Sequence, residues 1–167
     1  MLVMKIAGAF FAALLLPYCC SLLGSEKQAG YTVEDIRSVS ISCGHMNYAH
    51  SYSFFLRKEE SGWLLDADFA ADSESPHTEY AECPVTERDA QSVLDIVEQQ
   101  KLVQALRRYK KPIVKVTVSD ETMYYTLLGL ANGESIGAPK RVSEELETEF
   151  YRLADQYADS AKNREAP

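Results

Sequence analysis

The chain has 167 residues, of which 46% are hydrophobic and 25% charged, and its formal net charge is −8. This profile excludes a disordered polar chain, a collagen-like repeat and a membrane protein with many spans, and the length predicts one domain. Residues 1–24 hold one basic residue, Lys5, and no acid, so residues 25–167 carry 16 basic and 25 acidic groups, a net charge of −9. Because such a body repels phosphate, we expect no nucleic-acid partner.

The N-terminus has the pattern of an export signal. Met1 to Lys5 is a short basic start, Ile6 to Leu16 is an unbroken apolar run, and Pro17 ends any helix that continues. The expected division of the chain is a signal peptide or membrane anchor at 1–23, a flexible tether at 24–30, a single extracytoplasmic domain at 31–162 and a disordered tail at 163–167.

The mode of attachment has alternatives. Leu16-Pro17-Tyr18-Cys19 resembles a bacterial lipobox and predicts lipidation at Cys19, although Tyr18 stands where a small residue is usual. Alternatively, Ile6 to Leu23 is an 18-residue stretch without a charge, which is long enough for an uncleaved anchor across a bilayer. Free secretion is the third alternative. All three place residues 25–167 outside the cytoplasm, and the first two attach them to the cell membrane.

Two cysteines, Cys43 and Cys83, belong to the body of the protein. An exported domain is in an environment that permits disulfides, so we predict a bridge between them. Such a bridge would close a loop of about 40 residues and contribute roughly 3–4 kcal/mol in the chain-entropy model. The alternative is two separate buried thiols.

Apolar and polar residues alternate along three successive segments, which is the pattern of half-buried strands. The segments are Arg37 to Cys43, His50 to Arg57 and Trp63 to Phe69, with a turn at Glu59 to Gly62 between the last two. Three strands with short turns predict an antiparallel meander. Residues 71–82 are polar and irregular, and we expect a surface loop there.

The second half of the body repeats this order of elements. Thr86 and Asp89 resemble a capping box, and the apolar stripe that follows predicts a helix that continues through Leu106 and ends before Pro112. Asn132-Gly133 is a strong hairpin signal, and Ser143 is a helix N-cap. The later elements are strands at Ile113 to Ser119, Thr122 to Leu130 and Glu134 to Ala138, and a last helix that begins after Ser143 and includes Ala161.

The predicted fold class is therefore α+β. The elements follow one another in the order βββα-βββα. The two three-stranded meanders are expected to form one antiparallel sheet, with both helices packed on one of its faces.

Four segments carry a resemblance to a known group of proteins. They are Ser38 to Ser42, the serine- and tyrosine-rich Tyr48 to Phe54, Gly62 to Ala67, and the hairpin Leu130 to Ile136. In these segments the chain resembles uncharacterised exported lipoprotein-like domains of gut-associated Gram-positive bacteria. The resemblance implies export and this type of fold, and it implies no activity. The layout also resembles small exported modules such as PepSY and cystatin-like domains, which is an analogy of fold alone.

The candidate catalytic residues are few. Asp66 and Asp68 lie two apart on one predicted strand, with His50 on the neighbouring strand, so acid–base chemistry at this trio is the enzyme alternative. The sequence Gly133 to Gly137 matches G-x-S-x-G, but it follows a hairpin and all histidines precede its serine, so it predicts a turn. Cys43, His45 and His50 lack a second tight ligand pair. We expect no catalytic set, no metal and no cofactor.

The segment from Lys101 to Lys115 reverses the acidity of the body, since it has six basic residues and no acid. The cations Arg107, Arg108, Lys110 and Lys111 are the candidate binding residues, and their partner would be an envelope protein or an anionic polymer. The alternative is that these cations stabilise the end of a helix through its dipole. The sequence thus predicts a membrane-attached, non-catalytic binding module of the cell envelope.

Overall fold

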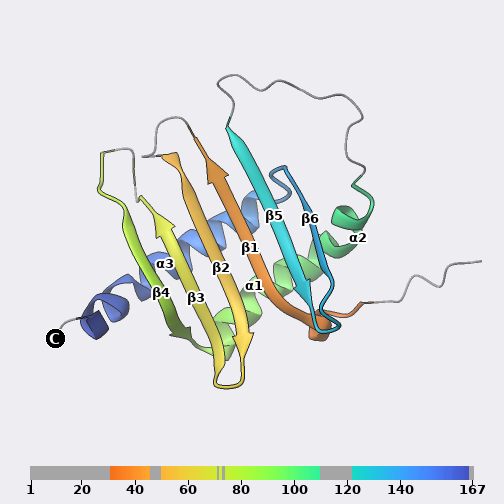
Figure 1. Ribbon diagram of the computed structural model, residues 1–167, viewed down its shortest axis with the longest axis horizontal. Helices are drawn as coiled ribbons and strands as arrows, with labels where there is room; N and C mark the ends of the chain where they lie inside the picture. The colour runs from red at the N-terminus through yellow and green to blue at the C-terminus, as the bar shows by residue number, and fades with distance from the viewer. Residues whose placement is uncertain (1–30, 46–49, 71, 73, 110–121, 166–167) are drawn as a thin grey trace, which may run out of the picture. The chain divides into compact units, whose positions relative to one another are not determined.

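The computed structural model describes residues 31–45, 50–70, 72, 74–109 and 122–165. Within them, six strands form one antiparallel sheet in the order β4-β3-β2-β1-β5-β6, accompanied by three α-helices (Figure 1). The predicted α+β class is confirmed. The predicted anchor, the tether, Cys19, Lys110, Lys111 and the strand at 113–119 lie outside the described residues.

The elements agree with most of the predicted ones to within a few residues. In chain order they are a 3₁₀ turn at Val33–Asp35, β1 (Ile36–Gly44), β2 (Tyr52–Glu59), β3 (Gly62–Phe69), β4 (Thr78–Val85), α1 (Glu87–Gln99), α2 (Leu102–Arg107), β5 (Met123–Leu130), β6 (Ser135–Ala138) and α3 (Glu144–Glu165). Since α3 continues to Glu165, the tail expected at 163–167 is helical over its first three residues.

The largest correction is β4, because the sequence predicted a surface loop over 71–82. Its buried residues Tyr80 and Cys83 are three apart rather than two, since a bulge inserts an extra residue opposite β3. Glu82 in this bulge has a φ of 55°, the left-handed region. Pro84 further disguises the strand, and it is tolerated because β4 is an edge strand.

The hairpin from β5 to β6 follows its sequence signal. Gly133 has a φ of 83°, and the Asn132 side chain accepts a hydrogen bond from the Glu134 N–H at 2.9 Å. Both features are typical of tight turns, where glycine and asparagine adopt or support conformations that other residues avoid. Together these residues confirm the predicted hairpin.

The predicted long helix is two helices. Its start is confirmed, since the Thr86 hydroxyl accepts a hydrogen bond from the Asp89 N–H at 3.1 Å. Lys101, with a φ of 53°, then separates α1 from α2, and α2 packs beside β6. The last helix also begins as predicted, with the Ser143 hydroxyl accepting from the Leu146 N–H at 3.0 Å.

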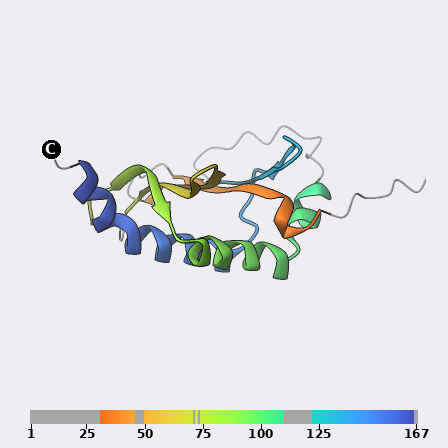
Figure 2. The ribbon, with the colours of Figure 1, turned by 90° about the horizontal axis from the view of Figure 1, so that it is seen from below.

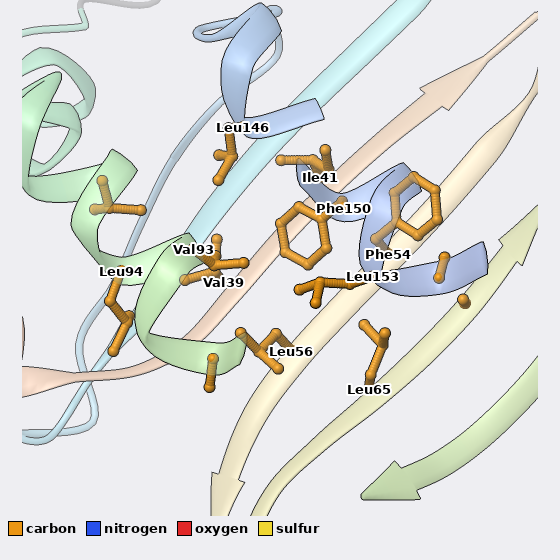
Figure 3. Close-up of a cluster of buried hydrophobic side chains, with 14 of the residues drawn as sticks. Val39, Ile41, Phe54, Leu56, Leu65, Val93, Leu94, Leu146, Phe150 and Leu153 are labelled. Atoms are coloured by element: carbon orange, nitrogen blue, oxygen red, sulfur yellow. The ribbon is translucent and has the colours of Figure 1, made fainter. Parts of the chain in front are cut away.

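Helices α1 and α3 lie on the same side of the sheet, as predicted (Figure 2). The core lies between these two layers, with Phe54 of β2 stacked on Phe150 of α3 at a centroid distance of 5.6 Å and an interplanar angle of 5°. Figure 3 shows side chains from β1, β2 and β3 meeting those of α1 and α3 in this cluster. Fully buried aromatic and aliphatic residues of this kind contribute most of the stability of such a fold.

The predicted disulfide is wrong, because no bridge joins Cys43 to Cys83. Cys83 pairs with Leu65, Leu65 with Leu56, and Leu56 with Val39, so Cys83 lies three strands away from β1. Three strand spacings are about 14 Å, and the four residues from Val39 to Cys43 add about 13 Å along the strand. A disulfide requires Cα atoms within about 7 Å.

In the described part of the chain, none of the helices has the length and apolar character that crossing a membrane requires.

Candidate functional site

A cavity of about 440 Å³ opens at the end of the sheet where β1 ends and where β2 and β5 begin. Its volume is in the range of small-molecule sites. The lining residues are Cys43, His45, His50, Tyr52, Ala70, Asp72, Thr122, Tyr124, Glu147 and Tyr151.

Strand register and helix period together bring the main side chains of this cavity to one place. Cys43 is the Cα partner of Tyr52 on β2 and of Tyr124 on β5, so these three residues stand side by side across adjacent strands. On α3, Glu147 and Tyr151 are four residues apart and therefore share a helix face. The cavity is thus formed by three strands and one helix from distant parts of the chain.

Aromatic rings form much of the cavity wall. Tyr52 and Tyr151 meet edge to face at a centroid distance of 5.4 Å, and Tyr151 also packs on Phe54 at 5.0 Å. The imidazoles of His45 and His50 form a second edge-to-face pair at 5.2 Å. Because Tyr151 is anchored in the aromatic core, its ring has a well-defined position at the cavity.

The Glu147 carboxylate is the centre of a charged network at this site. Arg141 Nε donates a hydrogen bond to Glu147 Oε2 at 2.7 Å, and the Tyr52 hydroxyl is a further donor to Glu147. Arg141 also donates from Nη1 to Glu144 Oε1 at 2.8 Å, and its guanidinium lies 5.8 Å from the centre of the Tyr124 ring. Arg141 is therefore shared between two carboxylates.

Burial raises the pKa values of the tyrosine and cysteine side chains in the cavity. It is the main cause that raises the pKa of Tyr52 well above its usual value, with the nearby Glu147 adding to the effect. Burial and Glu147 likewise raise the pKa of Tyr151 to about 12. The pKa of the Cys43 thiol is raised by burial and by Glu147, against a hydrogen bond from Tyr124. At neutral pH these groups are therefore uncharged hydrogen-bonding groups.

An uncharged thiol is a poor nucleophile, since the thiolate is the reactive form of cysteine. The phenols, with raised pKa values, are poor general bases at neutral pH. Across the described ranges, no group of three or more His, Cys, Asp or Glu residues is arranged to hold a metal ion. The tyrosine and cysteine side chains of this cavity offer hydrogen-bonding groups and aromatic surface to a ligand.

The residues of the predicted enzyme site are divided between two places. His50 lines the cavity beside His45, on the helix side of the sheet. Asp66 is on the opposite face of the sheet. There it forms an ion pair with Arg57, and its carboxylate accepts a hydrogen bond from the Glu82 N–H at 2.7 Å. Asp68 lies on that same face and is hydrogen-bonded to the imidazole of His77, with 2.6 Å between Asp68 Oδ1 and His77 Nδ1. The predicted trio of His50, Asp66 and Asp68 is therefore not one site.

Of the predicted basic patch, the structure describes Arg107 and Arg108. Arg107 Nη2 pairs with Glu134 Oε2 at 2.9 Å, and the guanidinium lies 4.1 Å from the centre of the Tyr31 ring. These contacts tie α2 to the start of the domain and to the β5–β6 hairpin. Arg108 is exposed. The contacts of Arg107 therefore hold parts of the domain together. Within the described residues, Arg108 is the exposed member of the patch.

Sequence reasoning missed several of the residues that form this site, among them Tyr124 and Glu147. Tyr124 belongs to a strand that was predicted, but its neighbours across the sheet depend on a register that alternation does not reveal. Glu147 lies four residues before Tyr151 on the predicted last helix. This spacing indicates that the two side chains share one face of the helix, and it was the one signal in the sequence that pointed to Glu147.

The fold and this cavity define a class, namely a two-layer α+β domain with a site of small-molecule size at one end of its sheet. We compared the chain with models of known families, with curated proteins and with solved structures, and none of the three comparisons found a match.

Proposed function

We propose that the protein is a membrane-attached, extracytoplasmic binding module of the cell envelope, without catalytic activity, and that its binding site is the cavity at the end of β1. The membrane attachment rests on the export pattern of residues 1–23. The binding role rests on the cavity.

One observation carries the binding role. The cavity brings together tyrosine, cysteine and carboxylate groups that often act in catalysis, but burial and the Glu147 network keep the tyrosine and cysteine groups protonated. An enzyme site shifts pKa values toward the operating pH, whereas these pKa values move away from it. Such groups are suited to hold a ligand by hydrogen bonds.

The cavity and the start of the domain lie at opposite ends of β1. The chain enters the domain at Tyr31, just before β1 begins at Ile36, and the cavity lies where β1 ends near Gly44. The length of β1 separates these two points by roughly 25–30 Å.

Protease treatment of intact cells tests the location. We expect the full-length protein in the membrane fraction, and we expect external protease to degrade residues 31–162 while a cytoplasmic control protein stays intact. If the domain is protected until the cells are lysed, the extracytoplasmic assignment is wrong. The intact mass of the purified protein then distinguishes a chain that begins at an acylated Cys19 from a full-length anchored chain.

A cavity-blocking variant tests the binding role. The purified full-length protein is screened by thermal denaturation against neutral sugars, amines, carboxylates and phosphates. We expect one class to raise the melting temperature of the wild type and of Thr78→Trp on the edge strand, but not of Thr122→Trp, since Thr122 lines the cavity. Recovery of the ligand unchanged supports binding, and its conversion to a product contradicts the proposal.

A further inference from the structure

We infer that the ligand of this cavity is a small organic cation that carries an ammonium group. The inference rests on the proposed binding role of the cavity and adds the chemical class of the ligand. Three features of the site support it, namely the sign of the charges, the aromatic wall and the volume.

The charged side chains that line the cavity, apart from the two histidines, are carboxylates. They are Asp72 and Glu147. Hydrogen bonds from the Glu74 N–H and from Ser75 lower the pKa of Asp72, so that it is an anion at neutral pH. Arg141 does not cancel this charge, because one guanidinium is shared between the carboxylates of Glu144 and Glu147. A concave site lined by one sign of charge concentrates ions of the opposite sign.

The charge of the whole domain acts in the same direction. Residues 25–167 carry a net charge of −9, so the surrounding surface also attracts cations and repels anions. This argues against an anionic polymer as the occupant of the cavity. The binding of a neutral ligand would not be strengthened by this negative charge.

The aromatic wall provides a second source of cation binding. Tyr52, Tyr124 and Tyr151 all border the cavity, and the face of an aromatic ring attracts a cation within about 6 Å of its centre. Beside the cavity, Tyr124 already makes one such contact, since the guanidinium of Arg141, which does not line the cavity, lies 5.8 Å from the centre of its ring. Aromatic side chains that surround a cavity are a common arrangement for binding quaternary ammonium groups.

The volume restricts the ligand to a small molecule. A cavity of about 440 Å³ lies in the lower half of the range of ligand pockets, so it admits a compact amine rather than a long chain. The combination of a small polar cavity, aromatic walls and two carboxylates thus indicates a compact cation.

Isothermal titration of the purified full-length protein tests the inference with a charged probe and its uncharged isostere. Choline and 3,3-dimethylbutan-1-ol have nearly the same shape and differ in the charged nitrogen. We expect choline to bind at least about tenfold more tightly than the isostere, as a desolvated cation–π contact with nearby carboxylates predicts. Glucose and acetate serve as the neutral polar and the anionic probes.

Variants of the lining residues refine the test. We expect Asp72→Asn and Tyr151→Leu each to weaken choline binding several-fold, whereas Tyr151→Phe keeps the ring and retains most of it. Asp95→Asn is the matched control, because Asp95 is an exposed acid on α1 away from the cavity. Since Tyr151→Leu removes core contacts, its fold is checked by circular dichroism, and Asp72→Asn tests the charge independently at an exposed position.

The outcomes separate the ligand class from the binding role. Equal binding of the isostere, or tighter binding of glucose or acetate, overturns the inference and leaves the binding role intact if Thr122→Trp abolishes that binding. Choline binding that Asp72→Asn and Tyr151→Leu leave unchanged also overturns it. If none of the probes binds and the wider thermal screen is negative, both the inference and the proposed function fail.

Discussion

The two faces of the sheet differ sharply although they share the same strands. The face beneath α1 and α3 carries the buried aromatic and aliphatic core. The opposite face carries serines, the Arg57–Asp66 ion pair and the contact between Asp68 and His77. Side chains alternate between faces at every residue, so a single strand supplies both environments. The comparison shows that stability is concentrated on one face, and that the cavity lies where this face opens at the end of the sheet.

Neighbouring phenylalanines on β2 give the strongest test of this comparison. Phe54 is 0% exposed and stacks on Phe150, whereas Phe55 is half-buried on the other face. We expect Phe54→Ala to lower the free energy of unfolding by about 3–5 kcal/mol and Phe55→Ala by less than about 1.5 kcal/mol. Urea denaturation of both variants measures the difference. Equal losses would show that the two faces are equally important to stability.

Asp66 tests whether the polar face contributes to stability at all. Asp66→Ala removes one of the three carboxylate partners of Arg57 and leaves the Glu82 N–H without its acceptor, so we expect a loss of about 1–2 kcal/mol. Asp95→Ala on the exposed side of α1 is the control, with an expected loss below about 0.5 kcal/mol. If the two variants unfold at the same urea concentration, the contacts of Asp66 with Arg57 and with the Glu82 N–H have no measurable stabilising effect.

The cap of α1 is expected to have a somewhat smaller effect. Thr86→Ala removes the acceptor of the Asp89 N–H, and the loss of such an N-cap lowers stability by about 1 kcal/mol. Thr86→Ser retains a hydroxyl and is expected to keep most of the stability. Thermal denaturation of the two variants decides this, and identical melting temperatures would contradict the role of the cap.

The carboxylate of Glu149 predicts a contribution that depends on pH. Hydrogen bonds from Arg152 are the largest cause that lowers the pKa of Glu149, and Ser92 adds to it. Since the folded pKa lies below the unfolded value of about 4.5, the contribution is complete above that value and is lost as the pH falls through the folded pKa. We expect Glu149→Gln to make the acid-induced loss of stability below pH 4.5 shallower, by under about 1 kcal/mol.

Arg152→Ala provides the check on this pH effect. It removes the main cause of the lowered pKa of Glu149, so the dependence of stability on pH is expected to become shallower in this variant as well. If both variants decline with the same slope as the wild type between pH 5 and pH 3, the assignment to Glu149 is wrong.

The smallest expected effect is that of a reducing agent. Because no disulfide joins Cys43 to Cys83, dithiothreitol is expected to leave the melting temperature of the domain unchanged. Both cysteines should react with iodoacetamide in denaturant without prior reduction, as mass mapping of their peptides would show. If labelling of both cysteines requires prior reduction, the placement of Cys43 and Cys83 on distant strands is contradicted.

Much of the fold follows from local patterns in the sequence. Alternation predicts β1, β2 and β3, the Asn132-Gly133 signal predicts the β5–β6 hairpin, and Thr86 and Ser143 predict the helix starts. These features depend on residues that are close in sequence, so a short window contains the information. The strand β4 was missed because its bulge at Glu82 breaks the two-residue period on which such a prediction relies.

The α+β class, most of the helices and strands and the apolar face of each can be predicted from the sequence alone. Which residues meet depends on the tertiary structure. It places Cys43, Tyr52 and Tyr124 side by side, brings Glu147 and Tyr151 of α3 to the same cavity, and puts two strands between Cys43 and Cys83. The reason is that alternation and helix period are local properties of the chain. Strand order, register and helix placement depend instead on how the apolar faces pack together.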